Sequence, residues 1–112
     1  MDTTTPLQHQ LCITCTNGMP ALAESEAQCL QTALPDWQCV GKTIVRTYQF
    51  TDHYETLAFV NALAWISHRT DHHPDLAVGY NQCRVSYWTH AANGLSINDF
   101  ICAAKADALL TI

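Results

Sequence analysis

One long segment without glycine or proline, from Tyr54 to Thr70, constrains the fold more than any other feature. It is long enough for a helix of about four or five turns, and Asp52 with Glu55 three positions later resembles a capping box. Its apolar residues occupy more than one stripe of a helix, which indicates burial on more than one side. We therefore expect this helix to pack against a sheet and against a partner subunit. The apolar residues are Leu57, Phe59, Val60, Leu63, Trp65 and Ile66.

Two pairs of strand-like segments flank this helix. Trp37–Val40 and Thr43–Phe50 are rich in β-branched and aromatic residues and are separated by Gly41-Lys42, which predicts a hairpin. Beyond Pro74, the segments LAVGY and QCRVSYWTH predict a second hairpin. Apolar and polar residues alternate in the last of these segments, so one of its faces is expected to be buried.

Helices are also predicted at both ends of this pattern. Ala21–Leu34 has apolar residues near helical spacing and ends at Pro35. Ser96 is a candidate N-cap for a last helix, with Asp99 at the third helical position. The resulting order, α-β-β-α-β-β-α, favours an α+β fold in which helices cover one face of an antiparallel sheet.

Composition limits the kinds of partner that the protein can bind. Hydrophobic residues make up 48% of the 112 residues and charged ones 13%, which favours a folded domain over disorder. We place a single domain at residues 21–112, after an N-terminal arm of residues 1–20. The five Lys and Arg residues are scattered and the formal net charge is −5, so no nucleic-acid binding is expected. No apolar run approaches the roughly 18–20 residues that cross a bilayer, so no membrane association is expected.

Six cysteines follow an N-terminus that lacks an export signal, which favours free thiols and a cytoplasmic location. Cys12 and Cys15 form a CxxC motif, and His9 precedes them. A structural zinc site usually has two such pairs, and a thioredoxin-like pair lies at a strand-to-helix junction. Neither condition holds here, so a loosely held arm is the main interpretation and metal or redox chemistry the alternative.

Histidines cluster after the long helix, in the sequence HRTDHHPDL. The residue before a proline avoids the α region, so His73 cannot continue the helix, which we expect to end near Asp71 or His72. His90 lies at the far end of a strand that can return to the same place. Histidine exchanges protons near neutral pH, so this arrangement suits acid–base chemistry.

Three interpretations of these histidines compete. They are side chains of an ordinary polar helix end; or His68 and His72, four positions apart, form a three-histidine metal site with His90; or they carry out metal-free acid–base catalysis on a small polar ring system. A resemblance favours the third interpretation.

The segments DHHPDLAVGYNQCRVSYWTH and GLSINDF resemble the active-site region of the pterin-4a-carbinolamine dehydratases. The resemblance covers roughly residues 21–112 and includes several separate motifs at matching spacing. They are His72-His73-Pro74, Tyr80, Thr89-His90, Gly94-Leu95-Ser96 with Asp99, and Trp37 in the sequence LPDW.

The resemblance implies a four-stranded antiparallel sheet with three helices packed on one face, assembled as a homodimer or a dimer of dimers. It implies a 4a-hydroxytetrahydropterin as substrate, which loses water to give a quinonoid dihydropterin. This reaction supports tetrahydropterin recycling for aromatic amino-acid hydroxylases and requires no metal and no organic cofactor.

The resemblance also implies roles for individual residues. His72 and His90 are the expected acid–base pair, and His73 is expected to contact the substrate and to assist catalysis. The other expected substrate-binding residues are Trp37, Asp71, Pro74, Thr89 and Asp99; for Asp99, capping of the last helix is an alternative role. Many relatives carry an acidic residue at the position that is His68 here, so the negative charge expected there is absent.

Two other functions remain open. Some members of the family are dimerisation partners of a transcription factor and act as coactivators through helix surfaces. Others are expected to act on another pterin, as in molybdopterin metabolism.

Overall fold

The computed structural model describes residues 5–111. Within this part of the chain, three α-helices and one four-stranded antiparallel sheet follow the order α-β-β-α-β-β-α, which confirms the predicted α+β fold. Three single-turn 3-10 helices complete the set. The elements are η1 (Leu7–His9), α1 (Glu24–Gln31), β1 (Gln38–Val40), β2 (Thr43–Gln49), α2 (His53–Thr70), β3 (Asp75–Val78), β4 (Gln82–Tyr87), η2 (His90–Ala92), α3 (Ile97–Ala108) and η3 (Leu109–Thr111).

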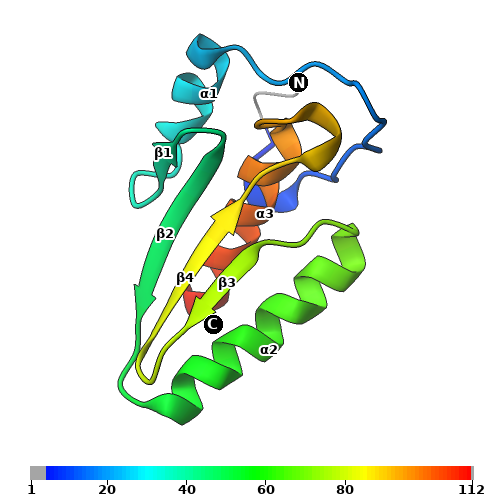
Figure 1. Cartoon of the computed structure of the whole chain (residues 1–112). Helices are drawn as coiled ribbons and strands as arrows, with labels where there is room; N and C mark the ends of the chain where they lie inside the picture. Colours follow the sequence, from blue (N-terminus) through cyan, green and yellow to red (C-terminus); the bar gives the residue numbers. More distant parts are fainter. Residues whose placement is uncertain (1–4, 112) are drawn as a thin grey trace.

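The sheet has the strand order β1-β2-β4-β3, so each predicted hairpin contributes one central and one edge strand (Figure 1). In the second hairpin, Asp75 of β3 pairs with Ser86 of β4. The residues just before β3 therefore lie at the same end of the sheet as the residues just after β4. This antiparallel register brings the His72-His73-Pro74 segment beside Trp88–His90.

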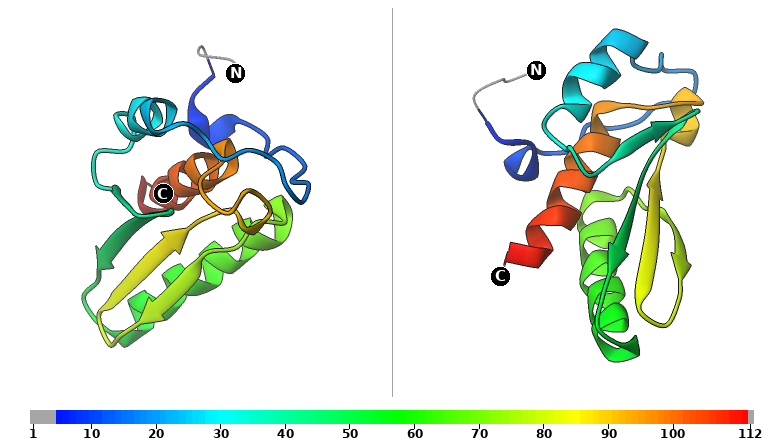
Figure 2. Two further views of the ribbon diagram at one scale, coloured as in Figure 1. Left: turned by 45° about the horizontal axis from the view of Figure 1, so that its top comes forward. Right: turned by 90° about the vertical axis from the view of Figure 1, so that its left-hand side faces the viewer.

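Helices α2 and α3 cover the same face of the sheet, as the right-hand view in Figure 2 shows. Cys83, Val85 and Tyr87 point into the resulting core, as their alternation in β4 predicts. Trp37, Tyr48 and Phe100 are also buried there. Close packing of these large side chains fixes the positions of both helices relative to the strands.

Helix α2 begins and ends where the sequence predicts. The Asp52 carboxylate accepts a hydrogen bond from the Glu55 backbone N–H at 2.9 Å and so caps the first turn. At the other end Asp71 takes the left-handed conformation, with φ 53°, which ends the helix and reverses the direction of the chain before His72. None of the helices in the described residues has both the length and the apolar character that crossing a membrane requires.

Helix α2 presents apolar side chains on two sides. Phe59 and Leu63 are buried against the sheet and α3. Tyr54, Leu57 and Trp65 are exposed, and Trp65 retains 63% of its accessible surface. The predicted second apolar stripe is therefore present, and its burial by a partner subunit stays a prediction.

The N-terminal arm packs on the domain instead of being loosely held. The Lys105 ammonium group donates a hydrogen bond to the Gln8 carbonyl at 2.8 Å, and the Gly18 N–H donates to the Ala91 carbonyl at 3.0 Å. Cys12 does not face Cys15. Its sulfur lies 3.7 Å from the sulfur of buried Cys102, on α3.

Four cysteines, Cys29, Cys39, Cys83 and Cys102, lie in apolar segments, which predicts that they pack as small apolar side chains. Cys83 and Cys102 are buried, as this predicts. Cys29 and Cys39 are exposed, so the prediction is wrong for these two residues.

Candidate active site

The ring of His72 is held by a buried carboxylate. Its Nε2 lies 2.6 Å from Oδ1 of Asp99, near the start of α3. The side chain of His72 keeps 10% of its accessible surface and that of Asp99 keeps none. A carboxylate accepts hydrogen bonds, so Nε2 is the donor and the other ring nitrogen, Nδ1, is left for a ligand.

Asp99 is itself fixed by two donors at its second oxygen. Oδ2 accepts hydrogen bonds from the Thr89 hydroxyl at 2.8 Å and from the Ser96 backbone N–H at 2.9 Å. The Ser96 and Thr89 hydroxyl oxygens lie 2.7 Å apart. Asp99 therefore caps α3, as its position in the sequence predicts, and also orients His72. These two roles are compatible because each carboxylate oxygen serves one of them.

The ring of Tyr87 packs against the ring of His72. It stacks on the His72 ring with a centroid separation of 5.9 Å and an angle of 9° between the planes. Burial raises the pKa of the Tyr87 phenol far above its usual range. Tyr87 thus remains neutral and gives His72 a flat, uncharged surface to pack against.

The three predicted histidines line one cavity of about 160 Å³. The His73 and His90 rings stack at a centroid separation of 6.3 Å, and the His90 ring lies 3.8 Å from that of Trp88. His73 and His90 are exposed, whereas His72 is largely enclosed. The lining residues are Cys15, Asp71, His72, His73, Trp88, Thr89, His90 and Ala91.

The other predicted substrate-binding residues do not all line this cavity. Asp71 and Thr89 line it, and Pro74 directly follows His73 and is half-buried. Trp37 is fully buried in the core, where its indole N–H donates to Asp107, and it is outside the described lining. Contact between Trp37 and a substrate stays a prediction that this position does not support.

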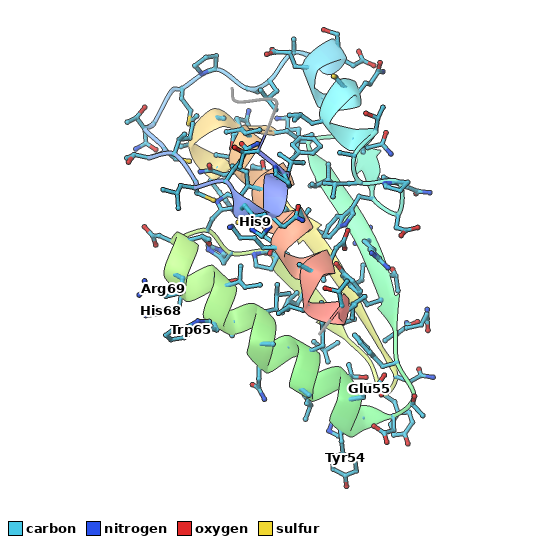
Figure 3. The ribbon with its side chains drawn as sticks, turned by 180° about the vertical axis from the view of Figure 1, so that it is seen from behind. His9, Tyr54, Glu55, Trp65, His68 and Arg69 are labelled. Carbon is cyan, nitrogen blue, oxygen red and sulfur yellow. The ribbon has the colours of Figure 1, made fainter. Side chains whose placement is uncertain are left out.

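His68 is not brought to the site. The left-handed turn at Asp71 breaks the helical periodicity on which an i, i+4 pair with His72 depends. His72 therefore turns toward Asp99, while His68 stays on the outer side of α2 beside Trp65 and Arg69 (Figure 3). Among residues 5–111, no group of three or more His, Cys, Asp or Glu side chains is arranged to hold a metal ion.

A larger cavity, of about 560 Å³, lies between the arm, α1 and α3. Its lining is mostly apolar and contains no histidine, and Glu26 is its only ionisable side chain apart from the Cys29 thiol. We place the active site at the smaller cavity, because acid–base groups from separate segments meet there.

Sequence reasoning did not predict Cys15, Trp88 or Ala91 as lining residues. The CxxC motif drew attention to Cys15. No local pattern linked it to a site formed more than fifty positions later in the chain.

Comparisons with known proteins agree on one family. A sequence model of the family described as pterin 4 alpha carbinolamine dehydratase matches residues 20–109. A protein of Nitrosospira multiformis, provisionally named pterin-4-alpha-carbinolamine dehydratase, is 54% identical over 113 residues, covering 100% of both chains. A protein of Dechloromonas aromatica with the same provisional name is 51% identical over 112 residues, again covering 100% of both chains.

Two solved structures are similar as well. A transcriptional coactivator/pterin dehydratase from Brucella melitensis superposes with a TM-score of 0.77 at 33% identity, covering 80% of this chain and 97% of that one. A pterin dehydratase-like protein identified as a RuBisCO assembly factor in the alpha-carboxysome superposes with a TM-score of 0.54 at 27% identity. That match covers 65% of this chain and 84% of the other.

Proposed function

Because the chain belongs to the pterin 4 alpha carbinolamine dehydratase family, we propose that it dehydrates a 4a-hydroxytetrahydropterin to a quinonoid dihydropterin by histidine acid–base catalysis. The observation that carries this proposal is the hydrogen bond between His72 and Asp99 beside a cavity that His73 and His90 also line. Three imidazoles around one small cavity provide both a proton donor and a proton acceptor near neutral pH.

The reaction consists of two proton transfers and the loss of one water molecule. A proton is added to the 4a-hydroxyl group, and the C4a–O bond breaks to release water. A base removes the proton from N5, and the electron pair of the N5–H bond forms the C4a=N5 double bond. A positioned acid and a positioned base typically contribute about 10²–10⁴-fold each.

His72 is the proposed base. Asp99 accepts a hydrogen bond from Nε2–H, which fixes the tautomer with a free electron pair on Nδ1. When Nδ1 takes the substrate proton, the ring becomes a cation that the buried carboxylate stabilises. The supporting bonds from Thr89 and Ser96 hold the carboxylate in place throughout.

His90 is the proposed acid. Its ring is exposed, so it regains protons from solvent after each turnover, and packing on Trp88 restricts its orientation. His73 lies beside it and is proposed to contact the substrate ring and to polarise it. Asp71 and Thr89 complete the polar part of the lining.

The cavity is smaller than the roughly 300–1,000 Å³ typical of ligand pockets. It suits the reacting edge of a flat bicyclic ring, with the remainder of the molecule projecting outward. We accordingly propose that the side chain of the pterin contributes little to recognition inside the cavity. Recycling of tetrahydropterin for an aromatic amino-acid hydroxylase, in the cytoplasm, is the role that we propose for this activity.

The proposal is tested by generating the carbinolamine in solution and following its breakdown with and without the protein. We expect a rate that rises in proportion to protein concentration and saturates with substrate. Heat-unfolded protein is the control. A breakdown rate equal to that in buffer would reject the proposal. Repeating the assay with pterins of different side chains tests whether another pterin, such as one of molybdopterin metabolism, is the preferred substrate.

The exposed apolar side chains of α2 favour a second function, in which the protein associates with a partner through this helix. The Brucella melitensis protein is described as a transcriptional coactivator as well as a dehydratase. Substitution of His72 and His90 by alanine distinguishes the two functions. Dehydration is expected to be lost, while association that depends on Tyr54, Leu57 and Trp65 is expected to persist.

A further inference from the structure

We propose that the N-terminal arm forms part of the active site, with Cys15 contacting the bound pterin and Asn98 acting as the positioning residue that holds the arm there. This inference rests on the proposed function. It adds to that function a substrate contact that lies outside the segment matched by the family model, which begins at residue 20.

Asn98 uses both ends of its side-chain amide to hold one residue of the arm. Its Oδ1 accepts a hydrogen bond from the Ile13 backbone N–H, and its Nδ2 donates to the Ile13 carbonyl, both at 2.8 Å. Nδ2 also lies 3.2 Å from the sulfur of Cys15. Asn98 keeps only 2% of its accessible surface. Ile13 of the arm therefore satisfies both the donor and the acceptor of this buried amide.

A second hydrogen bond holds the arm on the other side of Cys15. The Gly18 N–H donates to the carbonyl of Ala91, at 3.0 Å, and Gly18 has the positive φ of 84° that lets the chain turn there. Two residues of the domain, which we call the anchors, therefore hold the arm on either side of Cys15. One anchor, Asn98, directly precedes Asp99, and the other, Ala91, directly follows His90.

This arrangement places Cys15 at the cavity without giving it a part in the proton transfers. Cys15 lines the cavity with His72, His73 and His90. A sulfur atom is polarisable and packs favourably against the face or edge of an aromatic ring. We therefore expect Cys15 to act mainly on substrate binding, so that its loss raises KM more than it lowers kcat.

Kinetics of three variants test this inference. Cys15→Ala is expected to raise KM about fivefold and to change kcat by less than about twofold. Cys15→Trp, which fills the cavity from the arm, is expected to raise KM by about tenfold or more. Asn98→Leu, which keeps the approximate size but cannot bind Ile13, is expected to reproduce the effect of Cys15→Ala. Adding Cys15→Ala to Asn98→Leu should then change KM little further, because both substitutions remove the same contact.

Protection of the thiol by ligand gives a readout that is independent of turnover. The wild type is treated with iodoacetamide, with and without 7,8-dihydrobiopterin, and the labelled peptides are quantified by mass spectrometry. Labelling of Cys15 is expected to slow about fivefold or more in the presence of the pterin. Cys29 is the matched control, because it is exposed on α1 and is not among the residues that line this cavity, and its labelling should not change.

The outcomes separate this inference from the proposed function. If the wild type accelerates dehydration and binds the dihydropterin, but Cys15 is neither protected nor sensitive to substitution in KM, the arm is not part of the site and the proposed function stands. If the wild type neither accelerates dehydration nor binds the pterin, both proposals are wrong. Should Asn98→Leu fail to fold, Cys15→Ala and Cys15→Trp still decide the matter, since they leave both hydrogen bonds between Asn98 and the Ile13 backbone in place.

Discussion

Nε2 of His72 lies 2.6 Å from Oδ1 of Asp99, although the two residues are 27 positions apart in the sequence. The bond joins the segment after α2 to the first turn of α3 and holds the imidazole ring of His72 against a buried carboxylate.

Replacement of Asp99 by asparagine is predicted to lower kcat by about 10²-fold or more. An asparagine amide can donate to Nε2, which would move the ring proton to Nδ1 and remove the proposed base. The rate of carbinolamine dehydration measures this effect. Asp36→Asn, at an exposed acid before β1, is the matched control. A kcat for Asp99→Asn equal to that of the control would show that Asp99 only caps α3.

Replacement of Thr89 by valine is predicted to lower the free energy of unfolding by about 1–3 kcal/mol. The Thr89 hydroxyl donates to Oδ2 of Asp99, and both side chains are buried, so the carboxylate would lose a donor that water cannot replace. Denaturant-induced unfolding measures the change. The same substitution at Thr47, which is exposed on β2, should cost much less. Equal losses at the two positions would contradict the prediction.

Trp37→Phe distinguishes a core role from a substrate contact. The indole N–H of Trp37 donates to Asp107, which also accepts hydrogen bonds from Arg46 and Tyr48. Loss of this donor from a buried position is predicted to lower the free energy of unfolding by about 1–3 kcal/mol and to leave KM unchanged. A several-fold rise in KM, at a temperature where the variant is folded, would instead support the contact with substrate that the sequence resemblance implies.

The reactivity of Cys12 is predicted to depend on pH with a midpoint near 7. A hydrogen bond from the Cys102 thiol, aided by the positive charge of Lys105, outweighs burial and lowers the pKa of Cys12 to about 7. The thiolate is the reactive form, so alkylation by iodoacetamide should accelerate as pH rises through this value. In Cys102→Ala the donor is lost and the midpoint should move to higher pH. A wild-type midpoint near the ordinary value of 9.0 would contradict the account.

The element order, the two hairpins and the capping box of α3 were predictable, because each depends on residues that are close together in the chain. Convergence of His72, His73 and His90 was also accessible from the sequence. It follows from the antiparallel pairing of β3 with β4, which places the start of one strand beside the end of the other.

Other features depended on contacts that no local pattern indicates. The positive φ of Asp71 turns His72 away from the face that carries His68, so the i, i+4 spacing that suggested a metal site has no structural counterpart. Asn98 and Ile13 are 85 positions apart, and an asparagine in the first turn of a helix is usually an ordinary polar residue. The arm therefore looked loosely held, whereas these hydrogen bonds attach it to the site.

The most direct test of the central claim compares carbinolamine dehydration by the wild type, His72→Ala, His90→Ala and His68→Ala. His68 is the matched control, because it lies near His72 in sequence but on the outer face of α2. We predict that kcat falls about 10²–10⁴-fold in His72→Ala and in His90→Ala, and by less than about twofold in His68→Ala. Equal activity in all four proteins would contradict the account, because it would show that the histidines around the cavity do not transfer the substrate's protons.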